Sequence, residues 1–401
     1  MAVTALGAIS CAGVGVTALW DALVQSVAPA SKRISDFDST GLGNAKELRR
    51  LDPFTLYALM AADEAWRASG LVGPYDDGAS IVTTGIGGLQ TVLEQVNVLR
   101  EKGANRVSPF MVPMMMPNAA TAAVSMRFGL GGPAETVTTA CAAGTHAIGN
   151  AARLIASGRS RVAVAGGAEA VMVEIAEAGF RNMTALSNED FSRPFDLNRD
   201  GFVMGEGAGI LILEDWDFAH ERGATILAEV IGAASTADAH HITAPDPAGV
   251  GATRCMELAL ADAGISAADV SHINAHGTST PLNDLGESIA VHHVFGDNPP
   301  PVTSIKGHLG HSLAAAGALE GVASVLTLVN QLIPPTAGTT QVDPAIGLDV
   351  VIGAPRPAQI DVVLSNSFGF GGHNGSVVFR RYQAKSVCSI WRVRQEKRPT
   401  P

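Results

Sequence analysis

Short apolar runs alternate with longer stretches rich in alanine and glycine along most of the chain. Apolar runs of about four to eight residues with β-branched side chains are typical of strands covered on both faces. The runs that we predict to be strands are Ala2–Leu6, Ser80–Thr84, Thr136–Thr139, Arg161–Ala165, Ile210–Glu214, Ile226–Gly232 and Val362–Ser365. The stretches predicted to be helices include Gly144–Ser157, Thr253–Gly264 and Leu313–Leu332. Such alternation indicates an α/β fold in layers, with one βαβ unit running from Val137–Ala140 to Val162–Ala165.

Two segments have the same plan, a predicted strand followed by a sharp turn of small residues. One is Thr-Thr-Ala-Cys-Ala-Ala-Gly at 138–144, and the other is Leu-Ser-Asn-Ser-Phe-Gly-Phe-Gly-Gly at 364–372. This repetition predicts two related halves, each of which ends a strand at a common site. The turn-forming segment Arg222–Ala224 lies between them, so we predict one half at 1–225 and the other at 226–382.

The end of the chain differs in charge from the rest. Residues 383–401 hold five Lys/Arg residues and one Glu, whereas the whole chain has a net charge of −11. The segment has no apolar period that could be buried, and it is therefore predicted to be a disordered, solvated extension.

Composition narrows the classes of protein. The chain is 47% hydrophobic and 16% charged, which favours a large buried core and argues against disorder. The negative net charge argues against a nucleic-acid binder. The four cysteines, Cys11, Cys141, Cys255 and Cys388, are far apart, so we expect no disulfide framework and no zinc site, and a reducing cytoplasm as the location.

Two apolar segments resemble membrane or export signals. Met1–Trp20 carries no charge, but it lacks a basic start and contains glycines and hydroxyl residues, so we expect a buried strand, a turn and a helix start. Leu313–Leu332 contains Glu320, Asn330 and Gln331, which favours a buried core helix over a membrane span.

Cys141 is the first candidate for chemistry. It follows a β-branched run and begins a helix of small residues. A helix N-terminus has free N–H groups and a positive dipole end, which lower the pKa of a thiol. The small neighbours would let a substrate carbonyl approach the N–H of Cys141. A small buried cysteine that only packs fits Cys141 alone equally well.

Two further segments carry histidines. His276 follows the apolar run 270–273, where its imidazole could donate to a reacting carbonyl oxygen, although a structural histidine is the commoner case. Lys306 and His311 precede the helix 313–332. A buried Lys306 needs a partner, and Glu320 in that helix is the natural one. His308 is as plausible as His311 on chemistry alone.

The glycine-rich segment Phe368–Gly372 permits unusual backbone angles and hinge motion, so Phe370 could gate a pocket. A turn with two core aromatics is the simpler alternative. Neither this segment nor Gly85–Gly88 has the full dinucleotide fingerprint, and we therefore expect no Rossmann site.

Taken together and in this order, these segments resemble the elongating, two-histidine β-ketoacyl-acyl-carrier-protein synthases of the thiolase superfamily. The matching motifs are Thr139–Gly144, Asn274–Thr280, Lys306 with Gly310-His311, Asn366–Gly372, Ala165–Glu169, Ser192–Asp196 and Arg199–Val203. The resemblance covers about residues 2–382. It implies the thiolase fold, with two pseudo-repeated halves in αβαβα layers and mixed five-stranded sheets, usually as a homodimer.

The resemblance also implies roles for the site residues. Cys141 would hold the acyl group as a thioester. His276 and His311, supported by Lys306 and Glu320, would bind the malonyl thioester and stabilise the enolate formed by decarboxylation. The N–H groups of Cys141 and Phe370 would form the oxyanion hole, with Phe368 beside the gate. No metal or redox cofactor is expected, because substrates arrive on the phosphopantetheine arm of an acyl carrier protein.

More distant positions follow from the same resemblance. Thr278 and Thr280 match positions that bind the pantetheine arm, and Ile86 and Met116 match positions that line the acyl tunnel. The basic residues Lys46, Arg49, Arg50 and Arg106 match positions that dock an acidic carrier protein, whereas a further such position is Thr184 here.

The resemblance therefore implies an acyltransferase of fatty acid or polyketide biosynthesis. The condensing subunit of a type II polyketide synthase, acting as a heterodimer with a chain-length factor, is an alternative. Two others fit less well: a non-catalytic chain-length subunit would usually lack Cys141, and a thiolase would need a second cysteine near 368–372.

Overall fold

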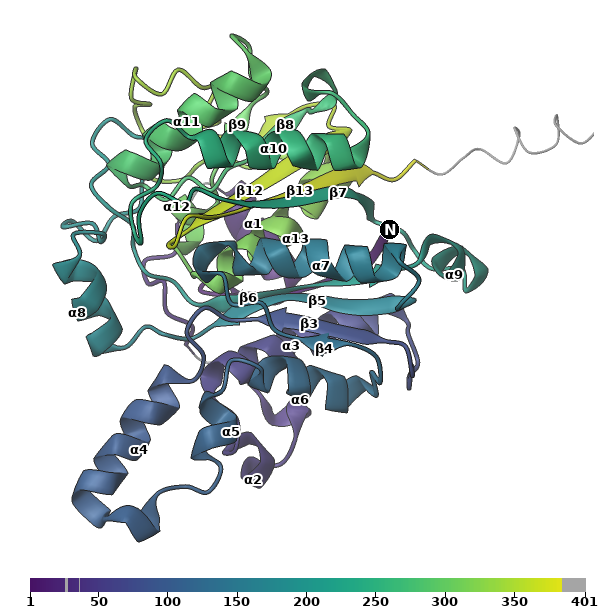
Figure 1. The fold of residues 1–401 in the computed structure, drawn as a ribbon, viewed down its shortest axis with the longest axis vertical. Coiled ribbons are helices and arrows are strands. Elements are labelled where there is room, and N and C mark those ends of the chain that lie inside the picture. Colours follow the sequence, from purple (N-terminus) through teal and green to yellow (C-terminus); the bar gives the residue numbers. More distant parts are fainter. Residues whose placement is uncertain (26–27, 36, 384–401) are drawn as a thin grey trace, which may run out of the picture.

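The chain folds into alternating layers of helix and sheet. The computed structural model describes residues 1–25, 28–35 and 37–383. Two helices, α7 (Ala143–Ala156) and α13 (Ala314–Asn330), lie between two sections of sheet, and other helices cover the outer faces (Figure 1). The order from one side to the other is helix, sheet, helix, sheet, helix, as the resemblance implied.

The remaining helices are α1 (Val16–Val24), α2 (Ala45–Leu48), α3 (Pro53–Ser69), α4 (Leu89–Lys102), α5 (Met111–Met115), α6 (Ala119–Phe128), α8 (Glu174–Asn182), α9 (Trp216–Glu221), α10 (Val250–Ala263), α11 (Pro281–Phe295) and α12 (Lys306–Leu309). The strands are β1 (Ala2–Ser10), β2 (Gly13–Val14), β3 (Ala79–Thr83), β4 (Ala134–Glu135), β5 (Val162–Glu169), β6 (Gly207–Glu214), β7 (Ala228–Ala237), β8 (His272–Asn274), β9 (Val302–Thr303), β10 (Leu332–Ile333), β11 (Arg356–Pro357), β12 (Val362–Gly369) and β13 (His373–Arg381).

The strand order shows that the chain contains the same unit twice. The main sheet runs β4-β3-β5-β6-β1-β7-β13-β12-β8-β9. The first five strands on this path belong to the first half of the chain and the last five to the second half. Outward from the junction of β1 and β7, each half places its first strand, then its last two in reverse chain order, then its two middle strands in chain order. The sections meet where β1 pairs with β7 through Ala2 with Glu229 and Val3 with Ala228. The halves that the sequence predicted are therefore present, whereas the dividing point at 225–226 stays a prediction.

The two central helices lie against backbone rather than against long side chains. A Cβ atom on Gly144 of α7 would lie 2.6 Å from the nitrogen of Ala318 in α13. A Cβ atom on Gly209 of β6 would also lie 2.6 Å from the backbone of Ala318. Because no side chain fits at either point, glycine is needed for this close approach. The alanine- and glycine-rich pattern thus encodes the packing of the central layer.

The outer layers bury their own cores. Helices α3 and α6 cover the β1, β3, β5 and β6 section, and α10 covers β7 and β13 and contacts α11. Phe54 and Ile210 are fully buried in the first of these cores, and Met256 and Leu364 in the second. No helix in the part of the chain that the structure describes is long and apolar enough to cross a membrane.

Most of the predicted strands and helices are present, with boundaries shifted by a few residues. The uncharged start forms the buried strand β1, a turn and α1, and Leu313–Leu332 forms the buried helix α13, as expected. Residues 384–401, which make up almost all of the predicted tail, lie outside the described residues.

The strand predicted at Thr136–Thr139 is wrong. Strand β4 ends at Glu135, and the next residues follow β3 without a backbone ladder. Side-chain hydroxyls take its place: Thr136 Oγ1 donates to the carbonyl of Val82 at 3.1 Å, and Thr83 Oγ1 donates to the carbonyl of Val137. The hydrogen bonds of this segment come from threonine side chains and not from a strand ladder.

Candidate active site

A pocket of about 380 Å³ lies where segments from both halves converge. Cys141, His276, His311 and Phe370 all line it, although they are far apart in the sequence. The two histidine rings have centroids 5.4 Å apart and cross at 82°. The structure therefore brings together the thiol and the two imidazoles that the sequence singled out.

Cys141 is positioned by a strained turn at the start of the central helix. Ala140 has a φ of 49°, which few residues other than glycine adopt, and Cys141 lies in the 3-10 turn Ala140–Ala142 that leads into α7. A Cβ atom on Gly369 would lie 3.0 Å from the nitrogen of Cys141. The glycine at the end of β12 thus allows the cysteine turn and the glycine-rich segment to touch.

The thiol itself is not activated by this position alone. Burial raises the pKa of Cys141 to about 11, although the charge of Lys306 and the N–H of Phe370 both act to lower it. The expectation of a lowered pKa for Cys141 is therefore wrong. Loss of water around the sulfur destabilises the thiolate more than the nearby positive groups stabilise it.

His276 lies in a loop whose backbone is held by two buried carboxylates of α11. Glu287 accepts hydrogen bonds from the N–H groups of His276 at 2.8 Å and Gly277 at 2.7 Å. Asp284 accepts from the N–H of Thr278 at 2.9 Å. These bonds satisfy backbone donors that β8 leaves unpaired when it ends at Asn274, and they fix the direction of the imidazole.

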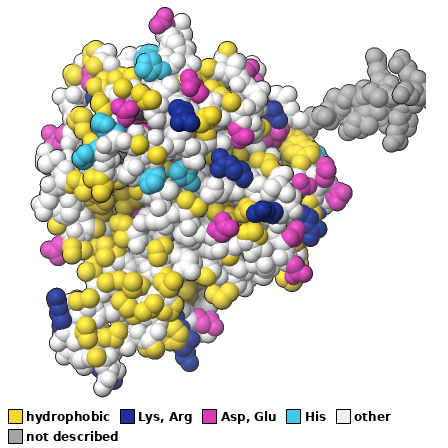
Figure 2. Space-filling model, viewed as in Figure 1, with side chains coloured by type: hydrophobic (Ala, Val, Ile, Leu, Met, Phe, Trp, Pro, Cys, Tyr) yellow, Lys and Arg dark blue, Asp and Glu magenta, His cyan; other side chains and the backbone are white. Residues whose placement is uncertain are grey.

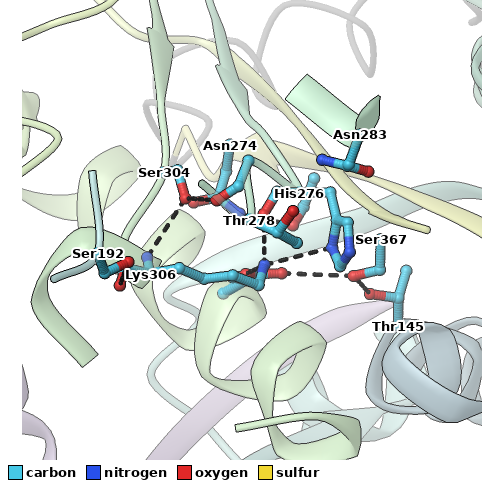
Figure 3. Close-up of polar contacts among 12 residues, drawn as sticks. Thr145, Ser192, Asn274, His276, Thr278, Asn283, Ser304, Lys306 and Ser367 are labelled. Atoms are coloured by element: carbon cyan, nitrogen blue, oxygen red, sulfur yellow. Dashed lines mark hydrogen bonds and ion pairs between the residues drawn. The ribbon is translucent and has the colours of Figure 1, made fainter. Parts of the chain in front are cut away.

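Lys306 determines which ring nitrogen of His276 carries the proton. Its ammonium lies 3.3 Å from Nδ1 of His276 and donates to the carbonyl of the same residue at 2.6 Å (Figure 3). An ammonium group can only donate, so Nδ1 must accept and the proton of the neutral ring must be on Nε2. His276 is thereby set as a hydrogen-bond donor through Nε2.

The ion pair predicted between Lys306 and Glu320 is present. Nζ of Lys306 donates to Oε1 of Glu320, and the two side chains are 2% and 0% exposed. Burial raises the pKa of Glu320, although Lys306 and Ser367 act to lower it. Lys306 begins the short helix α12, and its side chain reaches Glu320 in α13.

His311 and His308 differ sharply in their surroundings. His311 lines the pocket and packs edge-on against Phe202, with ring centroids 5.2 Å apart. Its backbone N–H donates to the carbonyl of Val203 at 2.7 Å. His308 is fully buried away from the pocket, and its ring nitrogens have no hydrogen-bond partner among the described residues. Of these two histidines, only His311 lines the pocket.

Both pocket histidines are kept neutral. Burial lowers the pKa of His276 and of His311 well below the usual value, and the positive charge of Lys306 lowers both further. At neutral pH each ring thus has one N–H to donate and carries no charge.

The glycine-rich segment and the two threonines also reach the pocket. Phe368 lies against His276 with ring centroids 5.8 Å apart, and Phe370 faces Phe180 of α8. Thr278 and Thr280 line the pocket, with their hydroxyl oxygens 2.8 Å apart. Thr184, from the turn after α8, lines it as well.

Ile86, Met116 and the basic residues lie elsewhere. Ile86 and Met116 are 40% and 42% exposed and do not line the pocket formed by the described residues. The four basic residues are exposed and lie around α2 and in the turn after α4: Lys46, Arg49, Arg50 and Arg106. Figure 2 shows apolar side chains gathered between charged ones in this part of the molecule. The assignment of Ile86 and Met116 to the tunnel and of the basic residues to carrier docking stays a prediction.

The sequence patterns did not identify several residues that line the pocket. Phe180 and Met183 come from the end of α8, and Asp238 and Thr243–Pro245 come from the long segment after β7. The segment 238–246 touches the glycine-rich turn, because Gly371 N–H donates to the carbonyl of Ile242 at 2.7 Å. The only sequence signal was a run of small and polar residues without an apolar period, which is typical of any long loop.

Comparison with known proteins places these features in a family. Residues 27–219 match the family described as "Beta-ketoacyl synthase, N-terminal domain", and residues 227–340 match "Beta-ketoacyl synthase, C-terminal domain". The 3-oxoacyl-[acyl-carrier-protein] synthase 2 of Synechocystis sp. is 42% identical, over 95% of this chain and 98% of that protein.

Solved structures agree with the sequence comparison. The ishigamide ketosynthase/chain length factor superposes with a TM-score of 0.90 at 33% identity, covering 95% of this chain and 99% of that one. A type II polyketide synthase acyl-carrier protein in complex with its ketosynthase gives a TM-score of 0.86 at 32% identity, with the same coverage. The chain therefore belongs to the β-ketoacyl synthase family and has its fold.

The raised pKa of Cys141 predicts how the free enzyme reacts with iodoacetamide. Because the pKa is about 11, the thiolate fraction and the alkylation rate should rise about tenfold per pH unit from about pH 7 to pH 9. Mass spectrometry of the peptide that contains Cys141 measures this rate separately from Cys11. A rate that is already constant above about pH 7 would contradict the effect of burial.

Proposed function

We propose that this chain catalyses decarboxylative Claisen condensation between an acyl group held on Cys141 and a malonyl group held on an acyl carrier protein. The observation that carries the proposal is the meeting of three groups in one pocket: the Cys141 thiol, the His276 ring and the His311 ring. Membership of the β-ketoacyl synthase family supports the same chemistry.

In the first step, Cys141 takes the acyl group. The sulfur attacks the carbonyl carbon of an acyl thioester on the pantetheine arm, and the arm leaves as a thiol that receives the proton of Cys141. The N–H groups of Cys141 and Phe370 would donate to the oxygen of the tetrahedral intermediate. The close approach of Gly369 to the cysteine turn supports this pairing, because it packs the glycine-rich segment against Cys141.

In the second step, the malonyl thioester loses carbon dioxide. The electron pair of the broken carbon–carbon bond moves onto the thioester and forms an enolate. His276, through Nε2–H, and His311 would donate to the enolate oxygen. Because both rings are neutral and buried, these donors act in a site with little water, where they stabilise the developing charge strongly.

In the last step, the enolate carbon attacks the thioester on Cys141. A new carbon–carbon bond forms, the sulfur leaves as a thiolate that takes up a proton, and the lengthened 3-oxoacyl group remains on the carrier. The thiol suits this role because its ester stays reactive toward carbon attack. These steps are carried by residues of the chain and by the substrates.

The arm of the carrier would enter past Thr278 and Thr280, whose hydroxyls line the pocket. The polyketide synthase relative was solved with an acyl-carrier protein bound, which supports a carrier protein as the partner here. A homodimer and a cytoplasmic location remain expectations from the family resemblance and the cysteine pattern.

A second candidate is the condensing subunit of a type II polyketide synthase that works with a chain-length factor. The relative with a TM-score of 0.90 is a ketosynthase/chain length factor pair, which favours it. Condensation by the purified chain alone supports the first candidate. Condensation that begins only when a chain-length partner is added supports the second.

Replacement of the thiol tests the core of the proposal. Cys141→Ala should lower chain extension by about a thousandfold or more, because no acyl group can be held. Decarboxylation of malonyl carrier protein should continue, since the two histidines remain. Mass spectrometry of carrier-bound products and release of carbon dioxide measure the two activities. Cys11→Ala, which changes a thiol outside the pocket, is the control, and undiminished extension by Cys141→Ala would refute the assignment.

The two neighbouring histidines provide a matched comparison. His311→Ala should lower decarboxylation by about a hundredfold, because one of the two enolate donors is lost. His308→Ala should keep the rate per folded molecule, since His308 does not line the described pocket. Circular dichroism measures the folded fraction of each variant. Normal release of carbon dioxide by His311→Ala would count against its role.

Carrier docking can be tested at Arg49, which is exposed, whereas Arg50 stacks on Phe110 at 4.1 Å and would lose that contact too. Arg49→Glu should raise the KM for malonyl carrier protein about fivefold at low salt and leave the KM for a small malonyl thioester unchanged. The matched control is Arg159→Glu, an exposed charge after α7. An equal effect of Arg49→Glu on both substrates would rule out docking at this position.

A further inference from the structure

A chain of buried hydroxyl groups joins the cysteine helix to the ion pair of Lys306 and Glu320. Thr145 lies one turn into α7 after Cys141, and its Oγ1 is 2.8 Å from Oγ of Ser367 in β12. Ser367 Oγ is in turn 3.3 Å from Oε2 of Glu320 in α13. Thr145, Ser367 and Glu320 are 2%, 0% and 0% exposed. Figure 3 shows this path continuing from Lys306 to Ser367 and Thr145.

The direction of the hydrogen bonds along this chain is fixed. An ionised carboxylate can only accept, so Ser367 donates to Glu320. The proton of Ser367 is then engaged, and Thr145 must donate to Ser367. Each hydroxyl thus points its proton toward the carboxylate. Hydrogen bonds aligned in this way strengthen one another where water is excluded.

The two carboxylate oxygens of Glu320 face different partners. Oε1 accepts from the ammonium of Lys306, and Oε2 accepts from Ser367. Burial favours the protonated form of Glu320 and thereby opposes the ion pair. The hydroxyl chain acts against this, because it stabilises the charged form at the oxygen that Lys306 does not reach.

The packing of the helices holds the hydroxyl chain in place. A Cβ atom on Gly317 of α13 would lie 2.4 Å from Oγ1 of Thr145 and 2.9 Å from Oγ of Ser367. Helix α13 therefore closes over the two hydroxyls at a glycine and excludes water from them. A threonine at 145 also suits this place because its β-branched side chain has few rotamers in a helix.

We propose that Thr145 and Ser367 are positioning residues that keep Glu320 ionised and thereby fix Lys306 against Nδ1 of His276. This inference rests on the proposed function, because its effect is read through His276 as an enolate donor. Neither hydroxyl lines the pocket of the described residues, so neither touches the substrate. The two hydroxyls act through Glu320 and Lys306 on the position and tautomer of the His276 ring.

Thr145→Val removes one hydroxyl and keeps the shape of the side chain. It should lower kcat for decarboxylation of malonyl carrier protein about fivefold, because a hydrogen bond that supports a buried charge is lost. KM should stay within about twofold, since no substrate contact changes. The alkylation rate of Cys141 should also be unchanged, although Thr145 lies on the same helix. Thr145→Ser restores the hydroxyl and should recover most of kcat.

Thr55→Val is the matched control. Thr55 is also a helical, buried threonine, 1% exposed in α3, and its hydroxyl has no hydrogen-bond partner among the described residues. Thr55→Val therefore measures the effect of deleting a buried hydroxyl that is not part of the hydrogen-bonded series from Thr145 to Glu320. Its kcat should equal that of the unmodified enzyme.

A double-mutant cycle tests whether the two hydroxyls act as one unit. Ser367→Ala should lower kcat more than Thr145→Val does, because Ser367 bonds to Glu320 directly. When Ser367 is already alanine, Thr145→Val should add little further loss, since the chain is broken in both cases. Independent, multiplicative losses would overturn the proposal, as would an unchanged kcat in Thr145→Val.

The same measurements separate this proposal from the proposed function. If the unmodified enzyme releases no carbon dioxide from malonyl carrier protein, the proposed function fails. If it does so normally and Thr145→Val matches it, only the hydroxyl chain is refuted. A loss that Thr145→Ser fails to recover, or that is accompanied by slower alkylation of Cys141, indicates a packing defect and also refutes the proposal.

Discussion

The buried ammonium of Lys306 is the group on which the site depends. An unpaired charge in the core would cost several kcal/mol, so the fold must supply a carboxylate, and Glu320 of the central helix α13 provides it. The same ammonium also donates to the backbone of His276 and faces its Nδ1. One buried cation thus links the central layer of the fold to the tautomer of an imidazole in the pocket.

The repeated architecture explains how residues far apart in sequence meet. In the first half the central helix α7 follows β4, and in the second half α13 follows β9, the strand at the same place in the repeat. The two central helices pack side by side between the sheet sections. Cys141 lies at the start of one, and His311 lies just before the other. Both helix starts therefore point to the same end of the molecule. A cysteine and a histidine at equivalent turns of the two halves meet because the repeat places them there.

Most strands and helices of the fold could be predicted from the sequence, because the strands are continuous apolar runs and the helices are unusually rich in small residues. The pair of Lys306 and Glu320 followed from the cost of a lone buried charge. Other features depend on contacts that no local pattern records. The threonine hydroxyls that replace a ladder at 136–139, and the loop 238–246 that lines the pocket, are set by tertiary neighbours. Ile86 and Met116 are 40% and 42% exposed, and their assignment to an acyl tunnel stays a prediction.

The pKa of Cys141 shows why position alone misled the sequence argument. A helix start and a nearby ammonium favour a thiolate, but the pocket that makes the enolate donors strong is dry, and dryness raises the pKa of the sulfur to about 11. The same burial keeps His276 and His311 neutral, as the donors proposed for the enolate must be. A pocket that held more water would lower the pKa of the thiol, but it would also weaken the hydrogen bonds that His276 and His311 donate. In the proposed reaction the site therefore favours the carbon–carbon bond-forming step, and the thiol passes its proton to the departing pantetheine arm as it is acylated.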